Sequence, residues 1–274
     1  MASPSIYNSM HTFLVRFLFV DRASRQPASL AARLAGWGIA LLLLSLLLTF
    51  AFHRLQYNWN WVAVWEYRWK FVHGWLTTLL ISGAALCCSL LLGIAAALAR
   101  RSRFIPLCSM SRLYLELVRG TPLLVQILVF FYVVADAFGL GNRYLVGVLT
   151  LSFFAGAYIS EIIRAGIESV GASQLESARA IGLTNLQTYR YVIFPQLARL
   201  VLPPLAGQFA SLVKDSSLLS IIAVNELTLN AQEVNAFTYS TMESYLPLAA
   251  GYLLLTLPIS LLSRHLENRV QYER

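Results

Sequence analysis

GASQLESARAIGLTNLQTYRYVIFPQLAR, residues 171–199, is a polar and basic stretch in a chain that is otherwise strongly apolar. Its first part predicts a short helix. Ser173 is a suitable N-cap residue, and Glu176 follows three residues later, as in a capping box. Gly182 is suited to end this helix, because glycine adopts the left-handed conformation without strain.

A second short helix is predicted to start at Asn185. It should end before Pro195, since the residue that precedes a proline is disfavoured in the helical region. Each helix is long enough to fill one groove of a partner. The apolar side chains of the first helix therefore need a cover, either a protein partner or the inner ends of membrane spans; these are Leu175, Ala178, Ile181 and Leu183.

The composition on both sides of this stretch is that of a membrane protein. The chain has 274 residues, of which 58% are hydrophobic and 12% charged, and its mean hydropathy is +0.63. Soluble domains carry about 25% charged residues, so disorder is excluded and a soluble enzyme is disfavoured. Helices of roughly 20 apolar residues span a bilayer. Six such segments are expected, near 36–52, 75–99, 120–138, 144–163, 200–224 and 246–263.

Basic residues predict how these spans are oriented. If the N-terminus is cytoplasmic, the inner segments hold 16 arginines and the outer segments hold four basic residues, which favours both termini inside. The first segment is read as an uncleaved anchor rather than a secretory signal, since about 35 residues precede it. The aromatic stretch 57–75 is read as an interfacial segment, with a substrate-stacking aromatic box as the alternative.

Catalytic chemistry is not predicted for this chain. Its only lysines, Lys70 and Lys214, do not follow a glycine, so no phosphate-binding GxxxxGK[ST] loop exists. The four histidines lack metal-ligand spacing, and no GxSxG motif occurs. We therefore expect no catalytic residue, no cofactor site and no metal site, and a role in transport or scaffolding.

Charged residues inside the spans are the first candidates for function, because burying them in a bilayer is costly. Glu161 and Arg164 share one helix face in the fourth span. They form either a local ion pair at the membrane edge or, through Glu161, part of a translocation path.

The fifth span is predicted to be broken twice. Pro203 and Pro204 remove two backbone donors, and a charged pair followed by two hydroxyl residues indicates a second break. Broken helices at membrane depth build substrate sites and gates. We expect a gate or pathway lining there, with a structural ion pair as the alternative, over Lys214, Asp215, Ser216 and Ser217.

The 171–199 loop resembles the EAA loop of permease subunits in binding-protein-dependent ABC importers. The family pattern is Glu-Ala-Ala, three residues, Gly, nine residues, then Ile-x-Leu-Pro. Four positions match and three differ: Glu176, Ala178, Gly182 and Pro195 match, whereas Ser177, Val192 and Phe194 are departures. The resemblance implies a coupling loop at 171–195, with Ser173, Glu176, Ser177, Ala178, Gly182 and Pro195 as its site residues.

Further stretches resemble the polar amino acid uptake subfamily, of the histidine, glutamine, glutamate and arginine type; these are LELVRGTPLLVQILVFFY at 115–132, GAYISEIIRAGIESV at 156–170 and LVKDSSLLSIIAVNEL at 212–227. The resemblance implies an all-α polytopic fold of the type I ABC importer permease kind. It would have five core transmembrane helices in 57–274 and an extra anchor helix, after a cytoplasmic tail, in 1–56.

The resemblance also implies partners. Two copies of a separate ATPase would bind ATP and Mg²⁺, a second permease subunit would complete a homodimer or heterodimer, and a periplasmic or extracellular solute-binding protein would deliver substrate. The chain would lie in lipid, in the bacterial inner membrane, and no nucleic acid partner is expected. Two alternatives stay open: a secondary amino acid transporter driven by an ion gradient, and a membrane scaffold or sensor.

Overall fold

The computed structural model describes residues 30–55 and 57–272. The chain divides into two compact units, Met1–Asn58 and Trp59–Arg274. The described helix of the first unit is α2 (Leu30–Leu55). It exposes apolar side chains along its length, and it contains the predicted anchor 36–52. The predicted cytoplasmic tail lies mainly outside the described residues.

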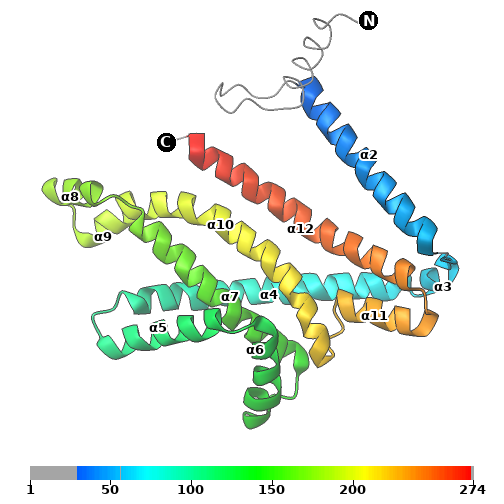
Figure 1. The fold of residues 1–274 in the computed structure, drawn as a ribbon. Coiled ribbons are helices and arrows are strands. Elements are labelled where there is room, and N and C mark those ends of the chain that lie inside the picture. The colour runs from blue at the N-terminus through cyan, green and yellow to red at the C-terminus, as the bar shows by residue number, and fades with distance from the viewer. Residues whose placement is uncertain (1–29, 56, 273–274) are drawn as a thin grey trace, which may run out of the picture. The chain divides into compact units, whose positions relative to one another are not determined.

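The second unit is built from helices, and no strand occurs among the described residues (Figure 1). Two π-helical stretches and one 3₁₀ stretch extend its α-helices. In chain order the elements are α3 (Trp61–Glu66), α4 (Arg68–Arg100), α5 (Ile105–Gly120), α6 (Leu123–Val129), η1 (Phe130–Ala135), α7 (Arg143–Glu168), α8 (Ala172–Ala180), α9 (Asn185–Thr188), η2 (Tyr189–Ile193), α10 (Phe194–Asp215), η3 (Ser216–Ile222), α11 (Leu227–Thr238) and α12 (Thr241–Tyr272).

Four described helices, α2, α4, α7 and α12, are long and apolar enough to cross a membrane. A fifth candidate is the pair α5 and α6–η1, which is bent by 112°. The span predicted near 120–138 contains the second arm of this pair, Leu123–Ala135, which meets α5 at the bend. The chain is extended at Thr121 and Pro122, where the proline restricts the residue before it. Helix α5, which precedes this bend, was not expected as part of a span, because its charged residues interrupt the apolar sequence.

The core forms where α4 lies against α7. Small residues allow the two backbones to approach closely: a side-chain carbon added to Gly93 would lie 2.6 Å from Ile159 and 3.0 Å from the Gly156 carbonyl oxygen. Ser152 of α7 donates a 3.3 Å hydrogen bond to Ala85 O of α4. The fully buried side chains around this contact come from several helices and include Ile127, Leu151, Leu212 and Leu219.

Helix α10 runs through Pro203 and Pro204 without a break, so the first predicted interruption of the fifth span is wrong. Packing against α7 and α12 holds the helix in place. Ser263 of α12 donates a 3.0 Å hydrogen bond to Pro203 O, which ties α12 to α10 at the proline pair. Packing and this bond hold α10 where two backbone donors are missing.

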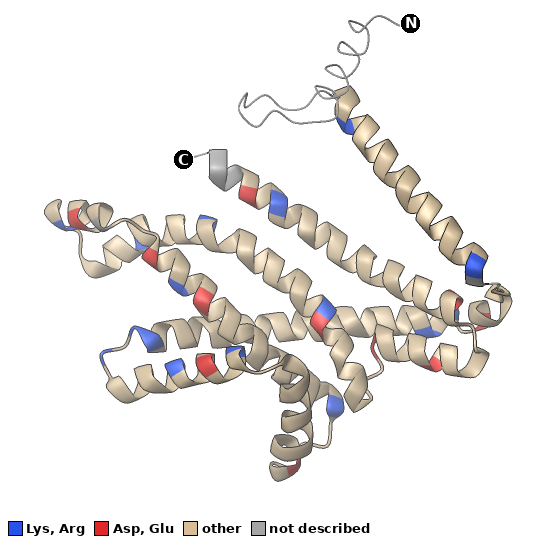
Figure 2. Cartoon of the chain, viewed as in Figure 1, with Lys and Arg blue, Asp and Glu red and all other residues tan. Residues whose placement is uncertain are grey.

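Within the second unit, α8 and α9 project at one end, beside the C-terminal end of α7 and the start of α10 (Figure 1). The end of α4 and the start of α5 lie toward the same side. Arginine gathers here, and α3 and α11 lie toward the other end (Figure 2). Polar side chains therefore mark both ends of a bundle whose middle is apolar, as expected for a membrane domain.

Candidate functional site

The predicted coupling loop forms a helix, a tight turn and a second helix. Helix α8 ends in a Schellman motif: Gly182 has φ +80° and donates to Arg179 O at 3.0 Å, while Leu183 donates to Ala178 O at 3.0 Å. The prediction that Gly182 ends this helix is confirmed. Glu176 and Ser177 are exposed on α8, whereas Ala178 is buried.

The predicted capping box at the start of α8 is wrong. Gly171 is the N-cap residue, and no side chain caps this helix. Only two residues separate Ser169, the C-cap of α7, from the first residue of α8. Ser173 lies one residue inside α8 and is exposed. The capping box occurs instead before α9, where Thr184 accepts from Gln187 N at 3.3 Å and Gln187 accepts from Thr184 N at 2.9 Å.

Helix α9 begins at Asn185, as predicted, but the second helix does not end before Pro195. The chain continues through the π-helical stretch η2 into α10, and Pro195 lies in the first turn of α10. The wider π-helical turn before the proline explains the difference, since it changes which carbonyl faces the ring. The loop is thus joined to α10 without an intervening coil.

A groove of about 390 Å³ separates α8 from the chain that leads into α10. Gln196 Nε2 donates a 2.7 Å hydrogen bond to Gln174 Oε1 across this groove. The residues that line it include Ser173, Ser177, Ala178, Leu183 and Val192. Two large apolar side chains that line it are exposed, Ile181 (77% exposed) and Tyr191 (63%). Leu186 (78%) and Phe194 (66%) are exposed elsewhere on the same loop. Such a surface is suited to binding a protein partner.

Glu161 lies at the centre of an arginine cluster. Arg164 Nη2 is 2.8 Å from its Oε2, as the predicted spacing implies. Arg100 of α4 forms an ion pair with Oε1, and Arg119 of α5 approaches Oε2 at 3.7 Å. One carboxylate therefore joins the ends of three helices. The contacts of Arg100 and Arg119 were not predicted, because those residues stood among the loop charges.

The same carboxylate lines a polar cavity of about 610 Å³. The cavity walls are Arg100, Arg112, Leu115, Glu116, Arg119, Gly120, Tyr158 and Glu161. Glu161 thus forms the predicted ion pair and also lines a cavity. The role of Glu161 in translocation stays a prediction.

The second predicted break of the fifth span is present. Helix α10 ends at Asp215, and from Ser216 onward the chain continues as the more tightly wound 3₁₀ helix η3. Ser216 is buried and donates to Val213 O at 2.8 Å, whereas Lys214 is exposed and Asp215 and Ser217 are half-buried. No ion pair joins Lys214 to Asp215 among the described residues, as adjacent positions of a helix do not face each other. A role as a gate stays a prediction.

Sequence reasoning missed a buried carboxylate, Glu226, which caps α11. Its oxygens accept from Thr228 N at 2.7 Å, Leu229 N at 2.8 Å and the Tyr252 hydroxyl at 2.8 Å. Thr78 of α4 accepts from Leu227 N at 3.1 Å. An acidic residue directly before a helical apolar run was the available signal. This network fixes α11 between α4 and α12.

Comparisons with known proteins identify the family. The family described as "Binding-protein-dependent transport system inner membrane component" matches residues 89–272 of this chain. The chain is 37% identical over 201 residues to the probable glutamine ABC transporter permease protein GlnM of Bacillus subtilis (strain 168), covering 73% of this chain and 93% of that protein. It is 34% identical over 219 residues to the glutamine transport system permease protein GlnP of Escherichia coli (strain K12), covering 79% and 99%.

A solved amino acid ABC transporter with histidines has the same fold, with a TM-score of 0.72 and 35% identity over 78% of this chain and all of that chain. The permease fold expected from the sequence is confirmed, and so is a transport component in place of an enzyme. An ATP-driven system is thereby favoured over a transporter that works from an ion gradient alone. This chain therefore belongs to the family of inner-membrane components of binding-protein-dependent transport systems.

Proposed function

We propose that this chain is the membrane subunit of an ATP-driven importer for polar amino acids, and that α8 and α9 receive the work of a separate ATPase. The observation that supports this most is the arrangement of the loop itself. Its exposed apolar side chains include two that line a groove, and Gln174 and Gln196 fasten the loop to α10. A force on α8 is therefore transmitted to a helix that runs toward Lys214 and Asp215.

The assembly proposed around the chain has four further parts. Two ATPase copies hold ATP and Mg²⁺, a second permease subunit completes the pair, and a solute-binding protein meets the outer surface. Both termini lie in the cytoplasm of a bacterial cell, on the side of α8 and α9. The arginine-rich end of the bundle supports this orientation. Reporter fusions to the C-terminus would test it.

Glutamine and related polar amino acids are the proposed substrates. Relatives named for glutamine transport support this class, and a further relative is named for L-cystine transport. Selectivity within the class is proposed to lie with the solute-binding protein.

Reconstitution into vesicles tests the proposal. The chain with its ATPase and solute-binding protein should accumulate labelled glutamine only when ATP is supplied, and the chain alone should not accumulate it under an ion gradient. Glu176→Lys, which reverses an exposed charge on α8, should weaken co-purification of the ATPase and leave membrane insertion unchanged. Uptake driven by an ion gradient without ATPase would overturn the proposal.

A further inference from the structure

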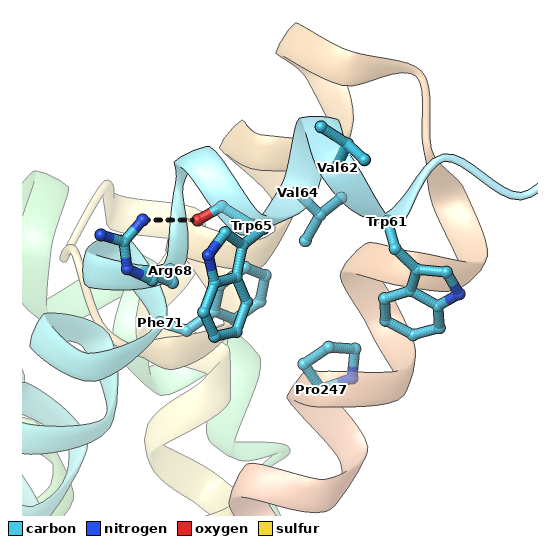
Figure 3. A pocket seen from close by; sticks show the side chains of 7 residues that line it. All are labelled: Trp61, Val62, Val64, Trp65, Arg68, Phe71 and Pro247. Carbon is cyan, nitrogen blue, oxygen red and sulfur yellow. Dashed lines mark hydrogen bonds between the residues drawn. The ribbon is translucent and has the colours of Figure 1, made fainter.

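An apolar groove lies at the end of the bundle opposite α8. It has a volume of about 550 Å³ and is formed between α3, the start of α4 and the start of α12. Its lining residues are Trp61, Val62, Val64, Trp65, Arg68, Phe71 and Pro247. Figure 3 shows the indoles of Trp61 and Trp65 on the same side of α3, with Phe71 and Pro247 near them. A single charged group, Arg68, stands at its edge.

The Arg68 guanidinium is held in place but keeps unused donors. Its Nη1 donates to Trp65 O at 3.1 Å, and its Cζ lies 5.4 Å from the Trp65 ring centre and 5.9 Å from that of Trp69. Within the described ranges no carboxylate forms an ion pair with it. A guanidinium has five N–H donors in a fork that fits a phosphate. Most of this capacity therefore points to an acceptor from outside the chain.

Arg68 makes a structural contact: its Nη1 reaches Trp65 O in the last turn of α3, where a cation is favoured by the helix dipole. It is also the first residue of α4, where the dipole of that helix opposes a cation. Its neighbour Lys70, by contrast, forms an ion pair with Glu233 of α11. The two cations at this end thus differ: Lys70 ties α4 to α11, whereas Arg68 lies over the apolar groove.

The groove lies at the headgroup end of α4. Helix α4 has 33 residues and is therefore about 50 Å long. A bilayer with its headgroups is about 40–45 Å thick, so the start of a helix of this length reaches the headgroup layer. Exposed tryptophans prefer this layer, and Trp61, Trp65 and Trp69 are 48%, 69% and 60% exposed. Phe71 lies one turn deeper than Arg68.

We propose that the groove binds one phospholipid, with the phosphodiester on Arg68 and an acyl chain along Trp61, Val64, Phe71 and Pro247. One cation at the edge of an apolar groove is complementary to a phospholipid, which carries a phosphate next to its acyl chains. The bound lipid joins α3 to α12 at the end of the bundle where α11 also packs. The site is independent of the proposed transport function.

The test is lipid binding by the purified full chain in detergent, measured by native mass spectrometry. The probes are dioleoyl phosphatidylglycerol, the matching diacylglycerol without a phosphate, and inorganic phosphate. We expect one phosphatidylglycerol per chain and binding about tenfold weaker in Arg68→Gln. Diacylglycerol should bind more weakly than phosphatidylglycerol and equally to both proteins, and inorganic phosphate alone should not be retained.

Two variants keep the result interpretable. Arg143→Gln removes an exposed arginine that lies outside the groove and donates to Ala223 O at 2.7 Å, and it should bind phosphatidylglycerol as the unaltered chain does. Trp61→Ala removes a wall of the groove and should weaken the binding of both lipids, with the helix content by circular dichroism unchanged. Equal phosphatidylglycerol binding by the unaltered chain and Arg68→Gln, or no retained lipid at all, would overturn the proposal.

Discussion

Gln174 of α8 and Gln196 of α10 are 22 residues apart in the chain and are joined by a 2.7 Å hydrogen bond. The donor, Gln196 Nε2, also contacts Val192 O at 3.0 Å, so this side chain is held on both sides. The bond crosses the groove between α8 and the chain that leads into α10. In the proposed function it is one route by which a force on α8 reaches α10.

Gln196→Leu should uncouple the loop without unfolding the chain. An uncharged hydrogen bond contributes about 1 kcal/mol, so we expect ATP-driven uptake to fall by up to about fivefold while the amount of chain in the membrane is unchanged. Gln232→Leu is the matched control, because Gln232 is exposed on α11 at the other end of the bundle. Uptake equal in the two variants would show that the bond carries no coupling.

Gly182→Ala should disturb the turn through backbone strain alone. Gly182 has φ +80° and open space where a side chain would lie, so the added methyl meets no atom but the conformation costs about 1 kcal/mol. Gly171→Ala is the control, because φ is −60° there and the new carbon would lie at an ordinary 3.7 Å from Ser173. Pull-down of the ATPase should be reduced only by the first. Equal pull-down would contradict the assignment of this turn.

Glu161→Gln should destabilise the arginine cluster. The change removes the carboxylate charge that Arg100 and Arg119 share and leaves Arg164 paired with Glu168 alone, at a cost of about 2 kcal/mol. The midpoint of thermal unfolding in detergent should drop, and uptake should fall with it. Glu116→Gln, in the same cavity but exposed, should change neither. An unchanged midpoint in Glu161→Gln would remove the cluster from any structural role.

Lys214→Ala should reduce transport more than assembly. Lys214 is exposed at the end of α10, directly before the change to 3₁₀ winding, so its loss leaves packing intact. Uptake per assembled complex is the measurement, and Lys214→Arg should restore it if positive charge is what matters. Full uptake in Lys214→Ala would leave this residue without a function in the gate.

Local chemistry predicted the turn at Gly182, the start of α9 and the break after Asp215, because each depends on a few neighbouring residues. The errors arose where distant contacts decide. Pro203 and Pro204 stay helical where α10 packs against α7 and α12, and a hydrogen bond from Ser263 ties α12 to Pro203 O. The capping pattern occurs at Ser173 and at Thr184, but only Thr184 stands directly before a helix, because α8 already begins at Ala172.

The arginine cluster around Glu161 was also predicted only in part, because most of its contacts join different helices. Spacing along one helix predicted Arg164, whereas Arg100 and Arg119 reach the carboxylate from α4 and α5. The charges of α5 made it look like a loop, although these charges face the cavity in the folded chain. The position of Glu226 before an apolar run could have predicted its capping role, but not its contact with the Tyr252 hydroxyl, which comes from α12.

Helix α10 is bordered by a wide π-helical stretch, Tyr189–Ile193, and by a narrow 3₁₀ stretch, Ser216–Ile222. A 3₁₀ stretch within a longer helix often marks a hinge, and π-helical turns are frequent at functional sites. Helix α10 thus carries an irregular winding both where the 171–199 loop joins it and where Lys214 and Asp215 end it. If the proposed coupling moves α10, these two stretches are the places where its backbone can adjust.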